Sequence, residues 1–280
     1  MTKKMTKNFD KKVVADFGAE WSRFDQKQVP TDELVHEFGR YFSIFPWELL
    51  PAEAIGFDMG CGSGRWAQFV APRVHQLHCV DLSDEALCVA KTKLANEKNC
   101  SFHLASVDDL PFDLNSMDFC YSLGVLHHIP DTAAGMRDCV SRLKRGGVFL
   151  VYLYYAFDGR PVWFVYLWRL SDLIREVISQ LPRSVKVVLT DLIAVGVYWP
   201  FSRLARIFEA IGVNVSNWPL SFYRKKSFYT LRTDALDRFG TTLEKRFTKL
   251  VIEEMMTQAG LINIRFNATA PFWCAIGIKS

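Results

Sequence analysis

The chain has 280 residues, of which half are apolar and 23% are charged. This length suits one large α/β domain with insertions, or two domains, and the composition excludes a disordered or collagen-like chain. The formal net charge of +4 is too small to indicate a nucleic-acid-binding protein by itself.

The seven cysteines include no C-x-x-C pair. They indicate reduced thiols in a cytoplasmic protein rather than a disulfide framework or a metal site. Uninterrupted apolar runs such as Val162 to Trp168 are far shorter than the ~20 residues of a membrane-spanning helix. We therefore expect no transmembrane segment, and the polar start of the sequence predicts no secretory signal.

Residues 1–50 predict helices, one over Lys11 to Phe24 and one beginning at Thr31. From Ala54 onward, short apolar runs alternate with helical stretches. The expected strands cover residues 55–59, 76–81, 101–105, 117–123 and 148–155. The intervening helices are expected through Trp66 and Phe69, after the N-cap residue Ser83, and from Thr132 to Leu143 with a stop at 144–147. This alternation predicts a parallel, doubly wound sheet.

The alternation stops at Ala156. Helices are expected over residues 161–181, 184–195 and 201–211, followed by an aromatic and basic loop over 217–233. The earlier pattern then resumes, with a helix over 249–258 and strands over 261–266 and 272–278. The helices after Ala156 lack the Lys/Arg-rich face typical of membrane-surface helices, so membrane contact is not predicted.

The complete pattern predicts a Rossmann-like, doubly wound, mostly parallel seven-stranded sheet with two helical additions. The domain boundaries that we predict are an N-terminal helical lid over 1–50, a core over 51–155 and 245–280, and a helical cap insertion over 156–244.

A glycine-rich turn after the first expected strand carries the strongest functional signal. It reads D-x-G-x-G-x-G, from Asp58 through Gly60 and Gly62 to Gly64. Glycines at a strand-to-helix turn let a ligand approach the backbone and the helix N-terminus. A dinucleotide site would place its third glycine at position 65, which is Arg, and no phosphate-binding G-x-x-x-x-G-K-[ST] loop is present in the sequence. A backbone loop beside a carboxylate suits a ligand with an ammonium group and a ribose but no phosphate, such as S-adenosylmethionine.

Together with three later segments, this turn resembles the class I S-adenosylmethionine-dependent methyltransferases over residues ~51–155 and ~245–280. The later segments begin at Asp81, Ala105 and Leu123. The resemblance implies S-adenosylmethionine as the cofactor, with the methionine part held by Asp58 and by the backbone of Gly60, Cys61, Gly62 and Gly64. It implies that Asp81 binds the ribose hydroxyls, that Leu82, Ser106 and Val107 lie at the adenine, and that Leu123 lines the cofactor. Where the family more often has Asp, this chain has Ser106, and Asp108 is the alternative contact.

The resemblance also implies methyl transfer to an oxygen or nitrogen of a small-molecule acceptor. His127 and His128 follow the fourth expected strand, and a neutral imidazole suits a general base, although both side chains could instead orient the loop. We prefer His127, because family members more often carry His at position 128 whatever their chemistry. Tyr223 is a weaker candidate base, and no metal is expected.

Several further residues are candidate acceptor contacts, namely Trp21, Arg23, Tyr155, Arg224 and Tyr229. Trp21 and Arg23 resemble part of an N-terminal box found in some of these methyltransferases, and helix packing is the alternative role. Arg224 and Tyr229 belong to a basic, aromatic run that could equally be a solvated loop. An RNA methyltransferase using this basic cap, or a cofactor-binding protein without turnover, are the alternative functions. The modest charge of the cap favours a small molecule, so nucleic acid is not expected.

Overall fold

The computed structural model describes residues 8–280, so the first seven residues of the predicted N-terminal lid lie outside the described residues. The chain divides into two compact units. Unit 1 comprises the N-terminal segment up to Asp25, then Glu37–Ala156 and Leu243–Ser280, and unit 2 comprises Gln26–His36 and Phe157–Thr242. Helix α2 (Thr31–Tyr41) contributes residues to both units.

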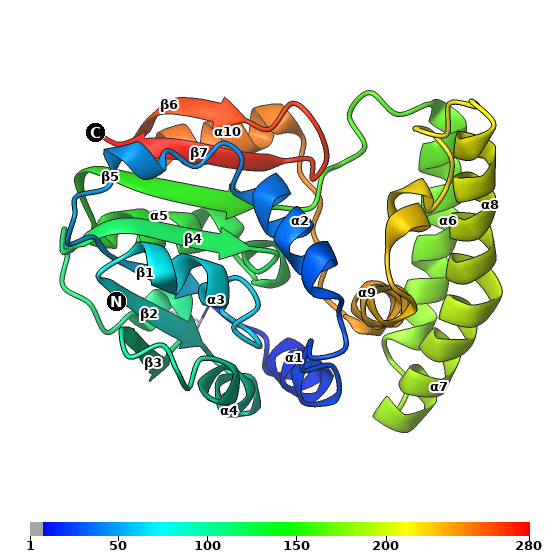
Figure 1. Ribbon diagram of the computed structural model, residues 1–280, viewed down its shortest axis with the longest axis horizontal. Coiled ribbons are helices and arrows are strands. Elements are labelled where there is room, and N and C mark those ends of the chain that lie inside the picture. Colours follow the sequence, from blue (N-terminus) through cyan, green and yellow to red (C-terminus); the bar gives the residue numbers. More distant parts are fainter. Residues whose placement is uncertain (1–7) are drawn as a thin grey trace, which may run out of the picture. The chain divides into compact units, whose positions relative to one another are not determined.

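Unit 1 is built on a sheet in which the described residues form seven strands, in the order β3-β2-β1-β4-β5-β7-β6 (Figure 1). The strands are β1 (Ile55–Met59), β2 (Gln76–Asp81), β3 (Cys100–Leu104), β4 (Met117–Leu123), β5 (Leu143–Tyr152), β6 (Leu261–Phe266) and β7 (Cys274–Lys279). Strands β1 to β5 pair in parallel, whereas β7 pairs antiparallel with both β5 and β6. The predicted doubly wound, mostly parallel, seven-stranded sheet is therefore confirmed.

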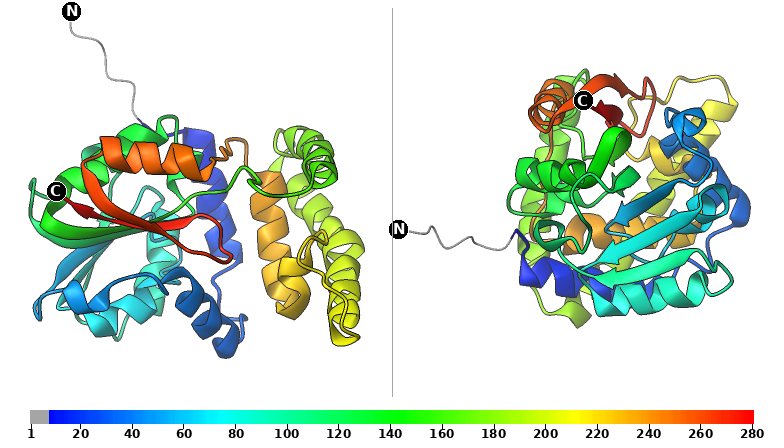
Figure 2. Two further views of the ribbon diagram at one scale, coloured as in Figure 1. Left: turned by 90° about the horizontal axis from the view of Figure 1, so that it is seen from above. Right: turned by 90° about the vertical axis from the view of Figure 1, so that its left-hand side faces the viewer.

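Helices cover both faces of this sheet. Figure 2 shows α5 (Thr132–Arg142) and α10 (Lys249–Gln258) on one side, and α3 (Ala67–Val70) and α4 (Asp84–Lys93) on the other. Strand β5 supplies both cores, because Phe149 and Val151 pack toward α5 and α10 while Val148 and Leu150 pack on the opposite face. This two-residue alternation within a continuous apolar run is expected of a strand with helices on both sides.

Polar side chains cap the helices of unit 1 and so place their first residues. Asp10 accepts hydrogen bonds from Lys12 N and Val13 N at the start of α1 (Lys11–Arg23), and Ser83 accepts from Ala86 N at the start of α4. Asp131 and Thr248 cap α5 and α10 in the same way. Each cap satisfies a backbone N–H that the first turn of a helix leaves without an intrahelical partner.

Two expected boundaries in unit 1 are wrong. Strand β5, expected to begin at Val148, begins at Leu143, because Leu143 is buried and pairs with Met117 while Lys144 forms an ion pair with Asp118 at 2.7 Å. Helix α5 itself ends at Arg142, close to the expected stop. The helix expected through Trp66 and Phe69 is only the four-residue α3, followed by a 3₁₀ turn over Ala71–Arg73.

Unit 2 contains α6 (Val162–Ile178), α7 (Arg183–Ile193), α8 (Trp199–Ala210) and α9 (Phe228–Gly240). A π-helical turn, Ala194–Tyr198, joins α7 and α8 into one continuous helix, where the sequence predicts two helices. The loop expected over 217–233 is also wrong, because Ser227 caps α9 by accepting from Thr230 N and the helix follows immediately. Figures 1 and 2 show α6 and the α7–α8 helix on the same side of α9.

The continuous helix Arg183–Ala210 has 28 residues and a mean hydropathy of 1.4 over its apolar window. By length and composition alone, it is the one helix among residues 8–280 that could cross a membrane. This differs from the expectation drawn from uninterrupted apolar runs, because a few charged residues interrupt an otherwise apolar helix.

Candidate functional site

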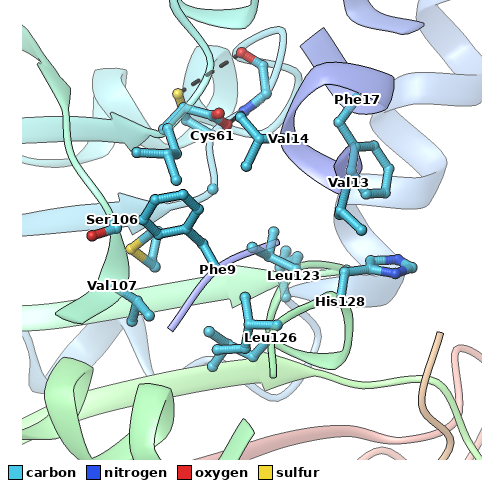
Figure 3. Close-up of a pocket in the computed structure, with 18 of the residues that line it drawn as sticks. Phe9, Val13, Val14, Phe17, Cys61, Ser106, Val107, Leu123, Leu126 and His128 are labelled. Atoms are coloured by element: carbon cyan, nitrogen blue, oxygen red, sulfur yellow. Dashed lines mark hydrogen bonds between the residues drawn. The ribbon is translucent and has the colours of Figure 1, made fainter. Parts of the chain in front are cut away.

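A cavity in unit 1 lies at the carboxyl ends of β1, β2 and β4, beside helix α1 (Figure 3). Ligands of doubly wound folds bind at this edge of the sheet. Most of the residues predicted to bind a cofactor line this cavity, namely Gly60, Cys61, Gly62, Asp81, Leu82, Ser106, Val107 and Leu123. Residues far apart in the sequence are thus brought together as predicted, whereas Asp58 and Gly64 lie outside the cavity lining.

The turn between β1 and α3 needs glycine for both conformation and space. Gly60 and Gly62 have φ values of +79° and +53°, in the region that side-chain-bearing residues rarely adopt. A Cβ atom on Gly60 would lie 2.4 Å from Val125, and one on Gly62 would lie 3.0 Å from the Trp21 ring. The loop therefore presents bare backbone to the cavity, which a ligand can approach closely.

Asp81 fixes this loop while lining the cavity. Its Oδ2 accepts a hydrogen bond from Gly62 N, and its Oδ1 accepts one from Ser83 N, both at 2.9 Å. Burial raises the pKa of Asp81 above its ordinary value, and the two backbone N–H groups oppose that rise. Because a carboxylate oxygen can accept more than one hydrogen bond, Asp81 can still accept from a ligand diol.

Asp58 is buried beneath the glycine loop. Its Oδ2 has no hydrogen-bond partner among the described residues. Loss of solvation raises the pKa of the Asp58 carboxyl well above its usual range, and the nearby Tyr121 hydroxyl opposes that rise. A buried carboxylate oxygen without a hydrogen-bond partner, lying below the glycine loop, can accept from a cationic ligand group or from a bridging water. Residues of this loop therefore fit a ligand that carries an ammonium group.

The two candidate adenine contacts after β3, Ser106 and Asp108, have different surroundings. Ser106 and Val107 line the cavity, whereas Asp108 Oδ2 accepts a hydrogen bond from Asn8 N at 2.9 Å. Asp108 is therefore engaged with the N-terminal segment, and Ser106 is the polar side chain of the two that faces the cavity.

The N-terminal segment contributes residues that the sequence analysis missed. The Asn8 side chain donates to Asp131 O and accepts from Asp131 N, both at 2.8 Å, so Asn8 holds the start of the described chain against two loops at the carboxyl edge of the sheet. Phe9 projects into the cavity beside Ser106 and Val107 (Figure 3). The Asp10 cap places the start of α1, but it does not reveal that the preceding residues enter a site.

The two histidines after β4 occupy different environments. His128 lines the cavity, and its Nδ1 donates to Leu243 O at 2.6 Å, so in the neutral form its Nε2 is the basic nitrogen. His127 is 0% exposed, does not line the cavity and packs against Tyr154 with ring centroids 3.9 Å apart. Burial, with the charges of His128 and Arg246, lowers the pKa of His127 well below its ordinary value. Of the two histidines, His128 is therefore the one that lines the cavity, whereas the sequence-based preference was for His127.

Of the three predicted acceptor contacts in unit 1, one lines the cavity and two do not. Trp21 lines the cavity against Gly62, as stated above, whereas Arg23 lies over the Phe24 ring at 5.2 Å and Tyr155 packs on Phe272 at 5.7 Å. Arg23 and Tyr155 do not line the cavity.

The remaining predicted contacts belong to unit 2. Tyr223 packs on Tyr198, and burial raises the pKa of Tyr223 well above its ordinary value, which keeps the phenol protonated at neutral pH. Arg224 forms an ion pair with Glu209 at 2.7 Å, and the Tyr229 hydroxyl accepts a hydrogen bond from Gln26 N at 3.0 Å. Contacts of these three residues with an acceptor stay predictions. Within residues 8–280, no group of three or more His, Cys, Asp or Glu side chains is placed to hold a metal ion.

Comparison with known proteins finds a family model that matches part of unit 1. Residues 57–151 match the methyltransferase domain family model. A ubiquinone biosynthesis O-methyltransferase from Xanthomonas axonopodis pv. citri (strain 306) is 32% identical over 145 residues, which are 50% of this chain and 59% of that protein. A phosphoethanolamine N-methyltransferase 2 from Caenorhabditis elegans is 36% identical over 101 residues, 35% of this chain and 23% of that protein. The chain thus spans little more than half of the first of these relatives and about a quarter of the second.

The fold comparison extends beyond the matched domain. A chain from the complex between the Haloferax volcanii Trm112 methyltransferase activator and a protein assigned as a methyltransferase aligns with a TM-score of 0.53 and 15% identity, covering 95% of this chain and 96% of that one. At this identity the likeness establishes the fold alone. Residues 57–151 are thus similar to a methyltransferase domain, and the strand order is that of a Rossmann-like, mostly parallel sheet.

Proposed function

We propose that the chain transfers a methyl group from S-adenosylmethionine to an oxygen or nitrogen atom of a small-molecule acceptor. The observation that carries the proposal is the cavity in which the Gly60–Gly64 turn and Asp81 meet Leu82, Ser106 and Val107. The bare glycine backbone and the Asp81 carboxylate suit a nucleoside without a phosphate group.

In this proposal the residues of unit 1 bind and orient the cofactor. Asp81 accepts hydrogen bonds from the ribose hydroxyls while it holds Gly62 N, and Leu82 and Val107 contact the adenine. The buried Asp58 carboxylate stabilises the ammonium group of the methionine part through its electrostatic field. When bound, S-adenosylmethionine supplies an electrophilic methyl group on a sulfonium, so alignment and exclusion of water are the main tasks of the protein.

His128 is the base that we assign for an oxygen acceptor. It lines the cavity, and the bond from its Nδ1 to Leu243 O orients the ring and leaves Nε2 to accept a proton. An amine acceptor would only need to arrive deprotonated. The names of the relatives include both an O- and an N-methyltransferase, so both acceptor classes belong to the proposal. The proposal also includes binding of the acceptor by the insertion over residues 156–244. It further includes a cytoplasmic location for the protein.

The test measures S-adenosylhomocysteine formation with panels of phenolic and amine acceptors. We expect turnover with at least one panel. With an oxygen acceptor, His128→Ala should lower kcat without weakening cofactor affinity, whereas the exposed control His75→Ala should leave both unchanged.

Three outcomes would contradict the proposal. Binding of cofactor without product from any acceptor would indicate a non-catalytic protein. Turnover only with RNA, weakened by salt, would indicate a nucleic-acid substrate. Loss of cofactor affinity in His128→Ala would remove the assigned base role.

A further inference from the structure

The helices of unit 2 carry their apolar side chains on the outside. Eighteen of the twenty-eight exposed large apolar side chains in the described part of the chain lie between Val162 and Ile211, on α6 and on the α7–α8 helix. Six others lie in unit 1, on several separate elements. Water-soluble domains rarely expose so large a contiguous apolar surface without a function for it.

On α6 these side chains form a single stripe. The members are each between 45% and 71% exposed: Val162, Trp163, Tyr166, Leu167, Leu170, Leu173, Ile174 and Val177. At 3.6 residues per turn, all eight fall within an arc of about 140°. On the α7–α8 helix, Val185, Val188, Leu192 and Val195 follow the same helical spacing before the π-helical turn, and Leu204, Ile207 and Ile211 follow it afterwards. We call these two stripes the outer apolar face.

The opposite sides of the same helices carry charge toward the interior of unit 2. Arg175, which is 8% exposed, donates to Asp172 at 2.6 Å and to the carbonyl oxygens of Thr241 and Thr242. Arg238 of α9 also donates to Asp172, at 3.1 Å. This is the reverse of the distribution expected for a helix that packs on its neighbour in water.

The α7–α8 helix shows the same reversal. Lys186, which is 4% exposed, donates to Gly240 O at 3.0 Å, and Asp191 pairs through both oxygens with Arg232. Beyond the π-helical turn, Arg203 donates to the carbonyl oxygens of Arg224 and Lys226. Charged groups satisfied inside a helical unit, with apolar side chains outside, are typical of helices that face lipid.

Charge and aromatic content favour lipid over a second copy of the chain. Residues 157–242 contain 12 Lys and Arg against 7 Asp and Glu, a net charge of +5, whereas the whole chain carries +4. They also contain four of the eight tryptophans. Trp163 is exposed on the outer apolar face, and Trp199 is exposed on the α7–α8 helix. Basic residues are attracted to anionic headgroups, and Trp and Tyr prefer the membrane–water interface. Two copies of the segment 157–242, each with a net charge of +5, would repel each other.

We infer that the outer apolar face of unit 2 docks on an anionic phospholipid membrane, with α6 and the α7–α8 helix lying in the interface. The sequence alone predicts no such contact, because the periodicity of a helix does not show which of its faces is exposed. The charged sides of both helices are bonded to other parts of unit 2, so the helices lie along the bilayer surface rather than cross it. The inference concerns attachment alone and does not depend on the proposed methyl transfer.

The test is sedimentation of the full chain with phosphatidylcholine vesicles, prepared with and without phosphatidylglycerol. The wild type should bind, more strongly to the anionic vesicles, with added salt weakening that preference. Two triple variants remove apolar area from the face, Leu170→Glu/Leu173→Glu/Val177→Glu on α6 and Val188→Glu/Leu192→Glu/Ile207→Glu on α7–α8. Each should lower vesicle partitioning by at least about tenfold, because binding scales with buried apolar area.

The matched control is Leu104→Glu/Leu114→Glu/Leu250→Glu, which changes three unit 1 side chains of 59–76% exposure. It should partition like the wild type, and far-UV circular dichroism and thermal melting should show all three variants folded. Either variant alone keeps the test valid if the other fails to fold. Absence of wild-type binding, or equal loss in the control, would overturn the inference. So would a wild-type dimer in light scattering that both face variants dissociate without any vesicle binding, because the face would then pair two copies of the chain.

Discussion

Replacing Asp81 by alanine tests how the cavity holds a nucleoside. The Asp81 carboxylate has two functions in the structure, because it accepts from Gly62 N and Ser83 N at 2.9 Å and also lines the cavity. Asp81→Ala removes the ribose acceptor and leaves two backbone donors beside the cavity. Hydrogen bonds to a charged group contribute about 1.5–3 kcal/mol each, and water that enters the cavity replaces part of that loss.

We therefore expect cofactor affinity to fall by about 1–3 kcal/mol, roughly 5- to 150-fold in Kd. Asp81→Asn should lie between alanine and the wild type, because it keeps one acceptor oxygen. Calorimetric titration with S-adenosylhomocysteine measures the affinity, and thermal melting without ligand reports separately on the cost to the fold. The matched control is Asp113→Ala, an exposed aspartate outside the cavity. Unchanged affinity in a folded Asp81→Ala protein would refute the ribose assignment.

Three further predictions follow from contacts within each unit. Asn8→Ala removes two hydrogen bonds to Asp131, so it should speed cofactor release and increase hydrogen exchange over residues 8–21. Hydrogen exchange equal to that of the wild type would show that Asn8 does not hold the N-terminal segment. Burial raises the pKa of Asp58, so this carboxyl stabilises the fold below the ordinary carboxyl pKa and loses that contribution as pH rises through the raised value. Asp58→Asn should therefore have a higher melting temperature than the wild type at neutral pH, and the difference should vanish in acid. The variant should also bind S-adenosylmethionine more weakly. A lower melting temperature at neutral pH would contradict the predicted direction of the stability change. Arg175→Leu should destabilise the protein by about 3 kcal/mol in urea unfolding, because it removes the donor shared by three buried or half-buried acceptors, whereas the exposed Arg169→Leu should cost little.

The parallel part of the sheet was readable from the sequence because most of its strands are short, largely apolar segments that alternate with helical stretches. The same periodicity located the glycine turn and Asp81, and parallel strands necessarily bring their carboxyl ends to one edge. The basic and glycine residues Lys144–Gly147 correctly marked the end of a helix, but they hid the start of β5, which begins at the buried Leu143. A local sequence pattern does not show whether pairing with a distant strand will override it.

Long-range contacts account for what the sequence analysis missed at the site. The hydrogen bonds of Asn8 to Asp108 and Asp131 join residues at least 100 positions apart, and no local pattern predicts them. The choice between His127 and His128 depends on which ring faces the cavity, and neighbouring positions look alike in sequence. In unit 2, apolar periodicity correctly predicted α6 but not its orientation, because the same stripe describes a helix that faces a protein core and one that faces outward.

The central claim is that the glycine turn and Asp81 form a site for S-adenosylmethionine. The most direct measurement is calorimetric titration of the wild-type protein with S-adenosylmethionine, S-adenosylhomocysteine and NAD in parallel. The structure predicts micromolar binding of both sulfur nucleosides and no heat signal from NAD, since position 65 is Arg where a dinucleotide site requires glycine. Binding of NAD, or no binding of either sulfur nucleoside by the folded protein, would contradict the account.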